Sequence, residues 1–121
     1  MINLSELRIG NIVEIMDKKE YVKGIMGNAV YFGEHGFIVN MLDFVEPVLI
    51  TEKLLLKCGF FKHIKFKNTY CKGSFSIKIT DSGVIYFKYN DFVIAELQFI
   101  HQLQNLFFSL CGEELVFYST E

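Results

Sequence analysis

The chain has 121 residues, about half of them apolar, with 13 Phe and 6 Tyr but no Trp. This length and composition predict one domain, or two small lobes that share a core, and exclude a disordered chain. The formal net charge of −2 predicts no bulk attraction to nucleic acid or to a membrane surface.

Residues 1–50 predict a β-rich N-terminal lobe. Short runs of β-forming residues at 12–16, 20–26, 29–32 and 37–42 are separated by residues typical of tight turns. So many short strands in so few residues indicate a small, curled antiparallel sheet of SH3-like appearance. Pro47 cannot donate to a strand ladder, so its run is an edge strand or a linker.

Residues 51–121 predict a C-terminal lobe that shares its core with the first. Thr51 and Gly59 are the N-cap and the terminating residue of a short helix. Segments 63–67 and 74–80 alternate strictly, which directs Ile64 and Phe66 to a core; with 84–89 they predict a three-stranded meander. Residues 99–111 predict a long helix and 114–118 a final strand. The expected fold class is α+β: SH3-like lobe, helix, three-stranded meander, long helix and final strand.

The chain shows no sequence pattern of an enzyme. Its histidines and cysteines lack the close spacing of structural zinc sites, and neither of the glycine-rich phosphate-binding motifs is present. The long helix separates His101 from Cys111 by nearly three turns, which is too far for a nucleophile and its base within that element. We therefore expect no catalytic, cofactor-binding or metal-binding residues and no cofactor.

The N-terminus and the cysteines indicate a reducing compartment. The three cysteines are an odd number without CxxC spacing, as is typical of reduced thiols. The first residues include Glu6 and Arg8 and lack the apolar run of a signal peptide. No stretch approaches the roughly 20 apolar residues that span a bilayer. These features predict a cytoplasmic protein without a membrane partner.

Charge is unevenly distributed along the chain. Residues 53–78 contain seven lysines and no acidic residue, whereas both flanks are acidic. Lysines interleaved with aromatic residues are typical of nucleic-acid-binding sheets. Against this, the predicted alternation places Phe66 and Phe75 opposite the lysines, and Arg8 is the only arginine. Three alternative roles remain for this segment: it neutralises the acidic flanks, it attracts an acidic protein, or it binds nucleic acid. The possible nucleic-acid-binding residues are Lys62, Lys65, Lys67, Lys72 and Lys78.

The long helix has an uncharged polar side. No Lys, Arg, Asp or Glu lies between Glu96 and Glu113, and a helix that faces solvent usually gathers such residues. Neutral amides suit a face that is partly covered, because no charge is buried. The cover is a loop of the same chain, a partner or second copy, or a ligand. The residues predicted to bind a partner are Gln98, His101, Gln102, Asn105 and Ser109.

Three segments together resemble a family of small uncharacterised proteins of Bacteroides-type bacteria, their prophages and mobile elements. The segments are NLSELRIGNIVEI (3–15), LITEKLLLKCGF (49–60) and FIHQLQNLFFSLCGEELVF (99–117). The family typically has an ELRIGN-type start, an LTEEWLLKFGF-like helix and a YVHQLQNLYFALTGEEL-like ending; Lys53, Leu54 and Cys111 depart from it. The resemblance implies a cytoplasmic accessory protein and no particular chemistry. We expect a non-enzymatic protein that acts through protein–protein binding or as a homodimer, with nucleic-acid binding as the alternative.

Overall fold

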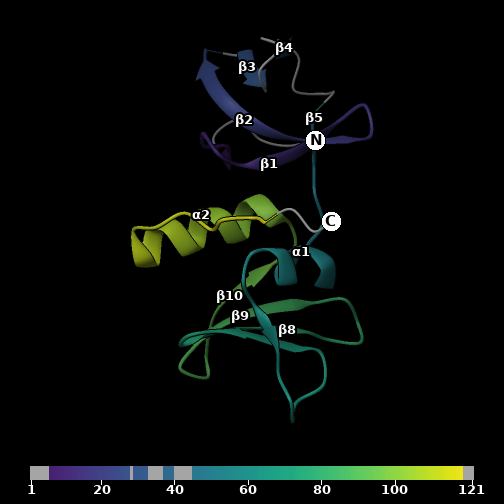
Figure 1. Ribbon diagram of the computed structural model, residues 1–121, viewed down its shortest axis with the longest axis vertical. Helices are drawn as coiled ribbons and strands as arrows, with labels where there is room; N and C mark the ends of the chain where they lie inside the picture. Colours follow the sequence, from purple (N-terminus) through teal and green to yellow (C-terminus); the bar gives the residue numbers. More distant parts are fainter. Residues whose placement is uncertain (1–5, 28, 33–36, 40–44, 119–121) are drawn as a thin grey trace. The chain divides into compact units, whose positions relative to one another are not determined.

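The computed structural model describes residues 6–27, 29–32, 37–39 and 45–118, with side chains for all of these except 37–39 (Figure 1). The described chain forms two compact units. Unit 1 comprises the described residues of 1–49 and 99–113, and unit 2 those of 50–98 and 114–121. Each unit contains one antiparallel sheet and one helix, so the predicted α+β class with antiparallel sheets is correct.

Unit 1 contains a five-stranded sheet in the order β4-β3-β2-β1-β5. Its strands are β1 (Ile12–Ile15), β2 (Lys18–Met26), β3 (Ala29–Phe32), β4 (Phe37–Val39) and β5 (Val45–Pro47). Met16 and Asp17 both adopt positive φ angles (50° and 66°), which is the geometry of a two-residue type I′ hairpin between β1 and β2. Pro47 lies in the edge strand β5, as its missing N–H predicts. The part of the predicted run 37–42 beyond residue 39 lies outside the described residues.

The core of unit 1 consists mainly of apolar side chains from the sheet, among them the large Phe32, together with Leu7. Val13, Val22, Val30 and Val45 are fully buried there, because alternate residues of each strand point to the same side.

Helix α2 (Ile100–Cys111) belongs to the same unit, whereas the sequence placed it with the C-terminal lobe. It buries Ile100, Leu103 and Phe107 of the apolar stripe that helical periodicity predicts, whereas Leu110 of that stripe is exposed; the polar residues His101 and Gln104 are buried as well. The helix ends at Gly112, which adopts the left-handed conformation (φ 72°).

Unit 2 contains helix α1 (Glu52–Lys57) and a second five-stranded sheet in the order β10-β9-β8-β7-β6. Its strands are β6 (Phe61–Lys62), β7 (Thr69–Lys72), β8 (Phe75–Ile79), β9 (Ile85–Tyr89) and β10 (Phe92–Leu97). Thr51 caps α1 by accepting a hydrogen bond from the Leu54 N–H at 3.3 Å, as predicted. Tyr70 of β7 bonds to Glu52 of α1, so the helix lies on the face of the sheet that carries Tyr70.

Three predictions for this unit were wrong. Residues 63–67 form a loop instead of a strand, and its apolar side chains are exposed. Residues 61–62, 69–72 and 92–97, which lie outside the three predicted strands, form β6, β7 and β10, so the sheet has five strands instead of three. Residues 114–118 form no strand; Leu115 is buried, and the Tyr118 N–H donates to the Lys57 carbonyl at 2.9 Å.

Candidate interaction surface

The polar side of α2 bonds to the start of its own chain. Asn105 Oδ1 accepts hydrogen bonds from Arg8 Nε at 3.1 Å and from Asn11 Nδ2 at 2.8 Å. Its Nδ2 donates to the Glu6 carbonyl at 2.7 Å. One side-chain amide therefore uses its acceptor and its donor on a segment almost a hundred residues earlier in the sequence. A carboxylate at this position could accept but could not donate.

Gln104 makes a second clamp of the same kind. Its side chain is only 1% exposed; its Oε1 accepts from the Ile12 N–H at 2.8 Å, and its Nε2 donates to the Gly10 carbonyl at 2.9 Å. Strand β5 pairs with β1 from Val13 onward, so these two backbone groups lie beyond the paired stretch. The amide matches a peptide group in having one donor and one acceptor, and it takes the place of a neighbouring strand.

The other members of the predicted partner-binding stripe are placed in different ways. Gln102 is half-buried and accepts from the Phe99 N–H at 3.0 Å, which caps the helix. Gln98 and Ser109 are exposed. Of the three expected covers, the structure shows the chain's own N-terminal segment over Asn105. Binding of a partner by the five residues stays a prediction.

His101 is buried without a hydrogen bond to its ring in the described structure. Its side chain is 1% exposed, neither ring nitrogen has a partner among the described residues, and the ring stacks on Phe99 at a centroid distance of 5.9 Å. Burial lowers the pKa of His101 below its ordinary value of 6.5, and the negative charge of Glu6 opposes this only in part. The ring is therefore neutral at pH 7.

Two of the five predicted lysines contact α1. Lys62 Nζ lies 3.7 Å from Glu52 Oε1 in an exposed ion pair. The Lys72 ammonium lies against Gly59, so close that a side chain at Gly59 would displace it. The Lys72 charge also opposes the effect of burial on Cys58, which raises the pKa of that thiol to about 11. These two lysines therefore lie on the face of the sheet that α1 covers.

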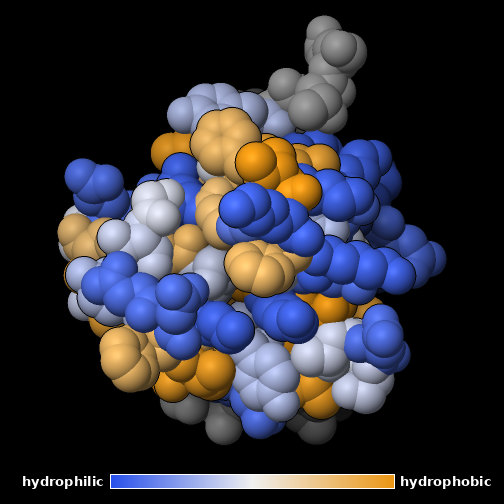
Figure 2. Space-filling model, turned by 90° about the horizontal axis from the view of Figure 1, so that it is seen from below, coloured by the Kyte–Doolittle hydropathy of each residue, from blue (hydrophilic) through white to orange (hydrophobic). Residues whose placement is uncertain are grey.

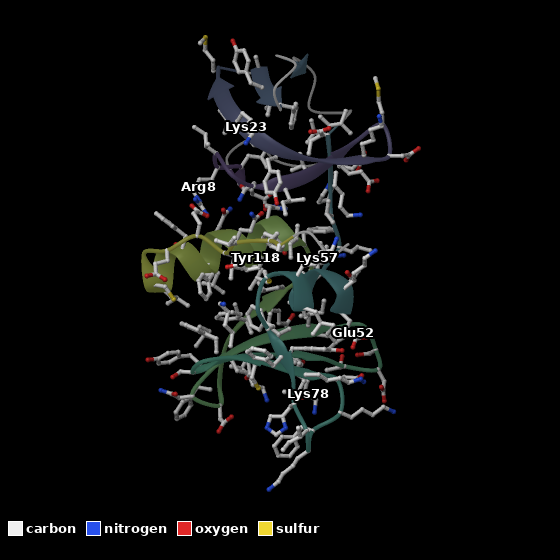
Figure 3. The ribbon with its side chains drawn as sticks, viewed as in Figure 1. Arg8, Lys23, Glu52, Lys57, Lys78 and Tyr118 are labelled. Carbon is white, nitrogen blue, oxygen red and sulfur yellow. The ribbon has the colours of Figure 1, made fainter. Side chains whose placement is uncertain are left out.

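Of the other three lysines, two lie in a loop and one lies on the opposite face of the sheet. Lys65 and Lys67 are exposed in the loop between β6 and β7. Lys78 is paired with Thr69 and Tyr86 in the ladder, one register position from Tyr70, so it points to the opposite face of the sheet. Figure 3 shows Lys57 of α1 and Lys78 on opposite sides of the sheet.

Residues 61–67, here called the basic loop, expose three large apolar side chains. Phe61 is 73% exposed, Ile64 95% and Phe66 61%. The sequence placed Ile64 and Phe66 in a core, and the structure overturns this because His63 curls the chain. His63 Nδ1 accepts from the Lys65 N–H at 3.0 Å and the Phe66 N–H at 3.1 Å, which no extended strand permits. The rings of His63 and Phe66 lie 4.8 Å apart.

The basic loop continues into the sheet face opposite α1, here called the open face. Residues paired across neighbouring strands share a face, so the register defines its members. One row runs through Phe61, Cys71, Ser76, Lys88 and Val93, and the next through Thr69, Lys78, Tyr86 and Glu96. In the view from below (Figure 2), hydrophobic side chains are interspersed among hydrophilic ones. The basic loop and the open face together present aromatic rings beside lysines.

Sequence reasoning missed three members of this surface. Tyr86 and Lys88 lie outside the lysine-rich segment, and only the strand register places Tyr86 beside Lys78 and Lys88 in the same cross-strand row as Phe61. Phe66 was assigned to the wrong side. The signal that could have corrected it is Asn68, which adopts a positive φ of 55° and turns the chain before β7.

The described residues show no second kind of site. No group of three or more His, Cys, Asp or Glu side chains in the described part of the chain could hold a metal ion. None of the helices there is long and apolar enough to cross a membrane. Cys58 is buried and its thiol donates to the Leu55 carbonyl, so it is a packing residue.

Comparisons with known proteins give no match: no family model, no curated protein and no solved structure is similar to this chain.

Proposed function

We propose that the chain is a non-enzymatic nucleic-acid-binding protein whose contact surface is the basic loop with the open face of unit 2. The observation that carries the proposal is the exposure of Phe61 and Phe66 beside Lys62, Lys65 and Lys67, within a segment (53–78) that contains no acidic residue. Exposed aromatic rings stack on bases, and lysines neutralise phosphates. The sequence argument against this function rested on Phe66 and Phe75 lying opposite the lysines and on the single arginine; of these premises, the one about Phe66 was wrong.

The polar side of α2 supports a partner contact less well. His101 is buried, and Asn105 is already bonded to residues 6–11 of the same chain. Of the predicted residues, a protein partner or a second copy would find Ser109 exposed on α2, whereas Gln98, also exposed, precedes the helix. A protein–protein role, including a homodimer through α2, therefore ranks second.

Two finer expectations belong to the same proposal. The strand order β4-β3-β2-β1-β5, in which the last strand returns beside the first, supports an SH3-like assignment for the unit 1 sheet. The setting of a cytoplasmic accessory protein of a phage or mobile element has only the three sequence segments as its support.

Fluorescence anisotropy with a labelled 20-nucleotide oligonucleotide of mixed sequence, titrated at several salt concentrations, tests the proposed function. Lys65, Lys67, Lys78 and Lys88 provide up to four phosphate contacts, so log K should fall with log[salt] with a slope of about −3 for a single strand. Replacing Lys65 and Lys67 by Glu should weaken binding at every salt concentration and reduce the slope by about 1.4.

The matched control is the Lys18→Glu, Lys19→Glu variant. It reverses two exposed lysines at the β1–β2 hairpin of unit 1, so it changes the net charge by the same amount at a distance in sequence from the proposed surface. The control should bind like the unaltered protein. Equal loss in both variants, or no binding that depends on salt, would contradict the proposed function.

A further inference from the structure

The composition of the surface restricts the kind of nucleic acid. We infer that the ligand is a single strand whose unpaired bases stack on Phe66 and Phe61 while Lys65, Lys67, Lys78 and Lys88 contact its phosphates. This inference rests on the proposed function and deepens it.

The first support is the type of side chain that is exposed. Phe61 and Phe66 have no hydrogen-bonding group, so they cannot read base edges in a groove. A benzene ring offers a stacking surface, and bases are free to stack on it only when they are unpaired. The pairing of His63 with Phe66 at 4.8 Å makes a two-ring group on the loop rather than one isolated ring.

The second support is the arginine content and the length of the helix. Arg8, the one arginine of the chain, is in unit 1, where its guanidinium bonds to Asn105 and lies 4.5 Å from the centre of the Phe108 ring. Unit 2 therefore has no arginine for the bidentate contact to guanine that is common in major-groove recognition. Helix α1 has six residues, which is under two turns, and Lys62 and Lys72 are turned toward it. The described part of unit 2 has no basic helix that could enter a groove.

The third support is the way the aromatic and basic groups are distributed. Phe61 on β6 and Lys88 on β9 share one cross-strand row, three strand spacings or about 14 Å apart. Tyr86 and Lys78 lie in the next row. A flexible single strand of a few nucleotides can follow such a row, because lysines along it contact the backbone while the bases stack on aromatic rings. Binding to an anionic membrane would instead require apolar side chains gathered only at the tip of the loop.

The experiment compares three probes with the full-length protein at low salt: a labelled single-stranded 20-mer, the same sequence as a duplex, and vesicles of anionic phospholipid. We expect the single strand to bind at least about tenfold tighter than the duplex. The Phe61→Ala, Phe66→Ala variant should lose about a hundredfold of single-strand affinity, since each of the two base–aromatic stacks contributes a factor of about ten. Because both side chains are exposed, the variant is expected to keep its fold.

Phe92→Ala is the matched control, because Phe92 is 75% exposed and is paired with Tyr89 on the other face of the same sheet. Its single-strand affinity should not change. Equal affinity for single strand and duplex, with both lost in the Lys65→Glu, Lys67→Glu variant, would overturn the single-strand inference and leave the proposed function standing. Binding to vesicles without binding to oligonucleotides, or binding to no probe, would overturn both. Equal losses in the Phe92 control and the double variant would overturn the assignment of the stacking residues.

Discussion

Replacing Gln104 by methionine removes two hydrogen bonds from the interior of unit 1 while keeping a side chain of similar size. The Ile12 N–H and the Gly10 carbonyl would both lose their partner on the side chain. Leaving a buried backbone group unsatisfied costs about 1–3 kcal/mol. Ile12 is buried and Gly10 is half-buried, so water can reach the second group more easily than the first. The expected loss in the free energy of unfolding of unit 1 is therefore about 3 kcal/mol.

The assay is urea or thermal unfolding followed by circular dichroism, with hydrogen exchange of the unit 1 amides as the local readout. For a domain of about this size, 1 kcal/mol corresponds to about 4 °C in Tm, so a shift of about 12 °C is expected. Ser109→Met on the same helix is the control: Ser109 is exposed, and the change should stay within about 0.5 kcal/mol. If the two variants were equally stable, the account of Gln104 as a backbone clamp would be refuted.

Two further predictions concern buried titratable groups. As the pH falls below about 6.5, the unfolded chain takes up a proton on His101 before the folded chain does, because burial lowers the folded pKa; stability should fall from pH 7.5 to 5.5. The Tm difference between these pH values should be smaller in His101→Leu, and an unchanged difference would show that His101 does not carry it. Burial raises the pKa of Cys58 to about 11, so at pH 8 iodoacetamide should modify the exposed Cys111 and leave Cys58 unmodified until urea is added. Mass spectrometry of the peptides checks this, and early labelling of Cys58 would contradict its burial.

The ends of the helices and the edge strand were predictable, because Thr, Gly and Pro each favour a particular position in a helix or sheet. Thr51 marked the start of α1, Gly112 marked the end of α2, and Pro47 indicated an edge strand. The burial of Ile100, Leu103 and Phe107 in α2 followed from the helical period, whereas the burial of His101 and Gln104 did not.

The errors occurred where a distant or unusual contact decides the structure. The alternation of residues 63–67 is a valid strand pattern, but His63 bonds to two backbone N–H groups ahead of it and Asn68 turns the chain. The sequence indicates that the neutral amides of α2 are covered, but the residues that bond to them, within 6–12, are more than ninety positions away. No local pattern reports such a pairing. Residues 114–118 have the composition of a strand, but they pair with none of the described strands and therefore form no strand themselves.

The proposed surface combines both kinds of error. Phe61 and Lys88 are 27 positions apart in sequence, and only the register of four strands places them in one cross-strand row. Phe66 is exposed because residues 63–67 form a loop instead of the predicted strand. The segment that carries most of the lysines was visible in the sequence, whereas the side of the sheet on which each lysine lies was not.

The most direct test of the central claim is a titration of the isotope-labelled full-length protein with an unlabelled single-stranded oligonucleotide, followed by amide chemical shifts. The account predicts that amide chemical shifts change in the basic loop and around Lys78 and Lys88, while those of α2 and of the unit 1 sheet do not change. Changes centred on α2, or an unchanged spectrum at saturating oligonucleotide, would contradict it.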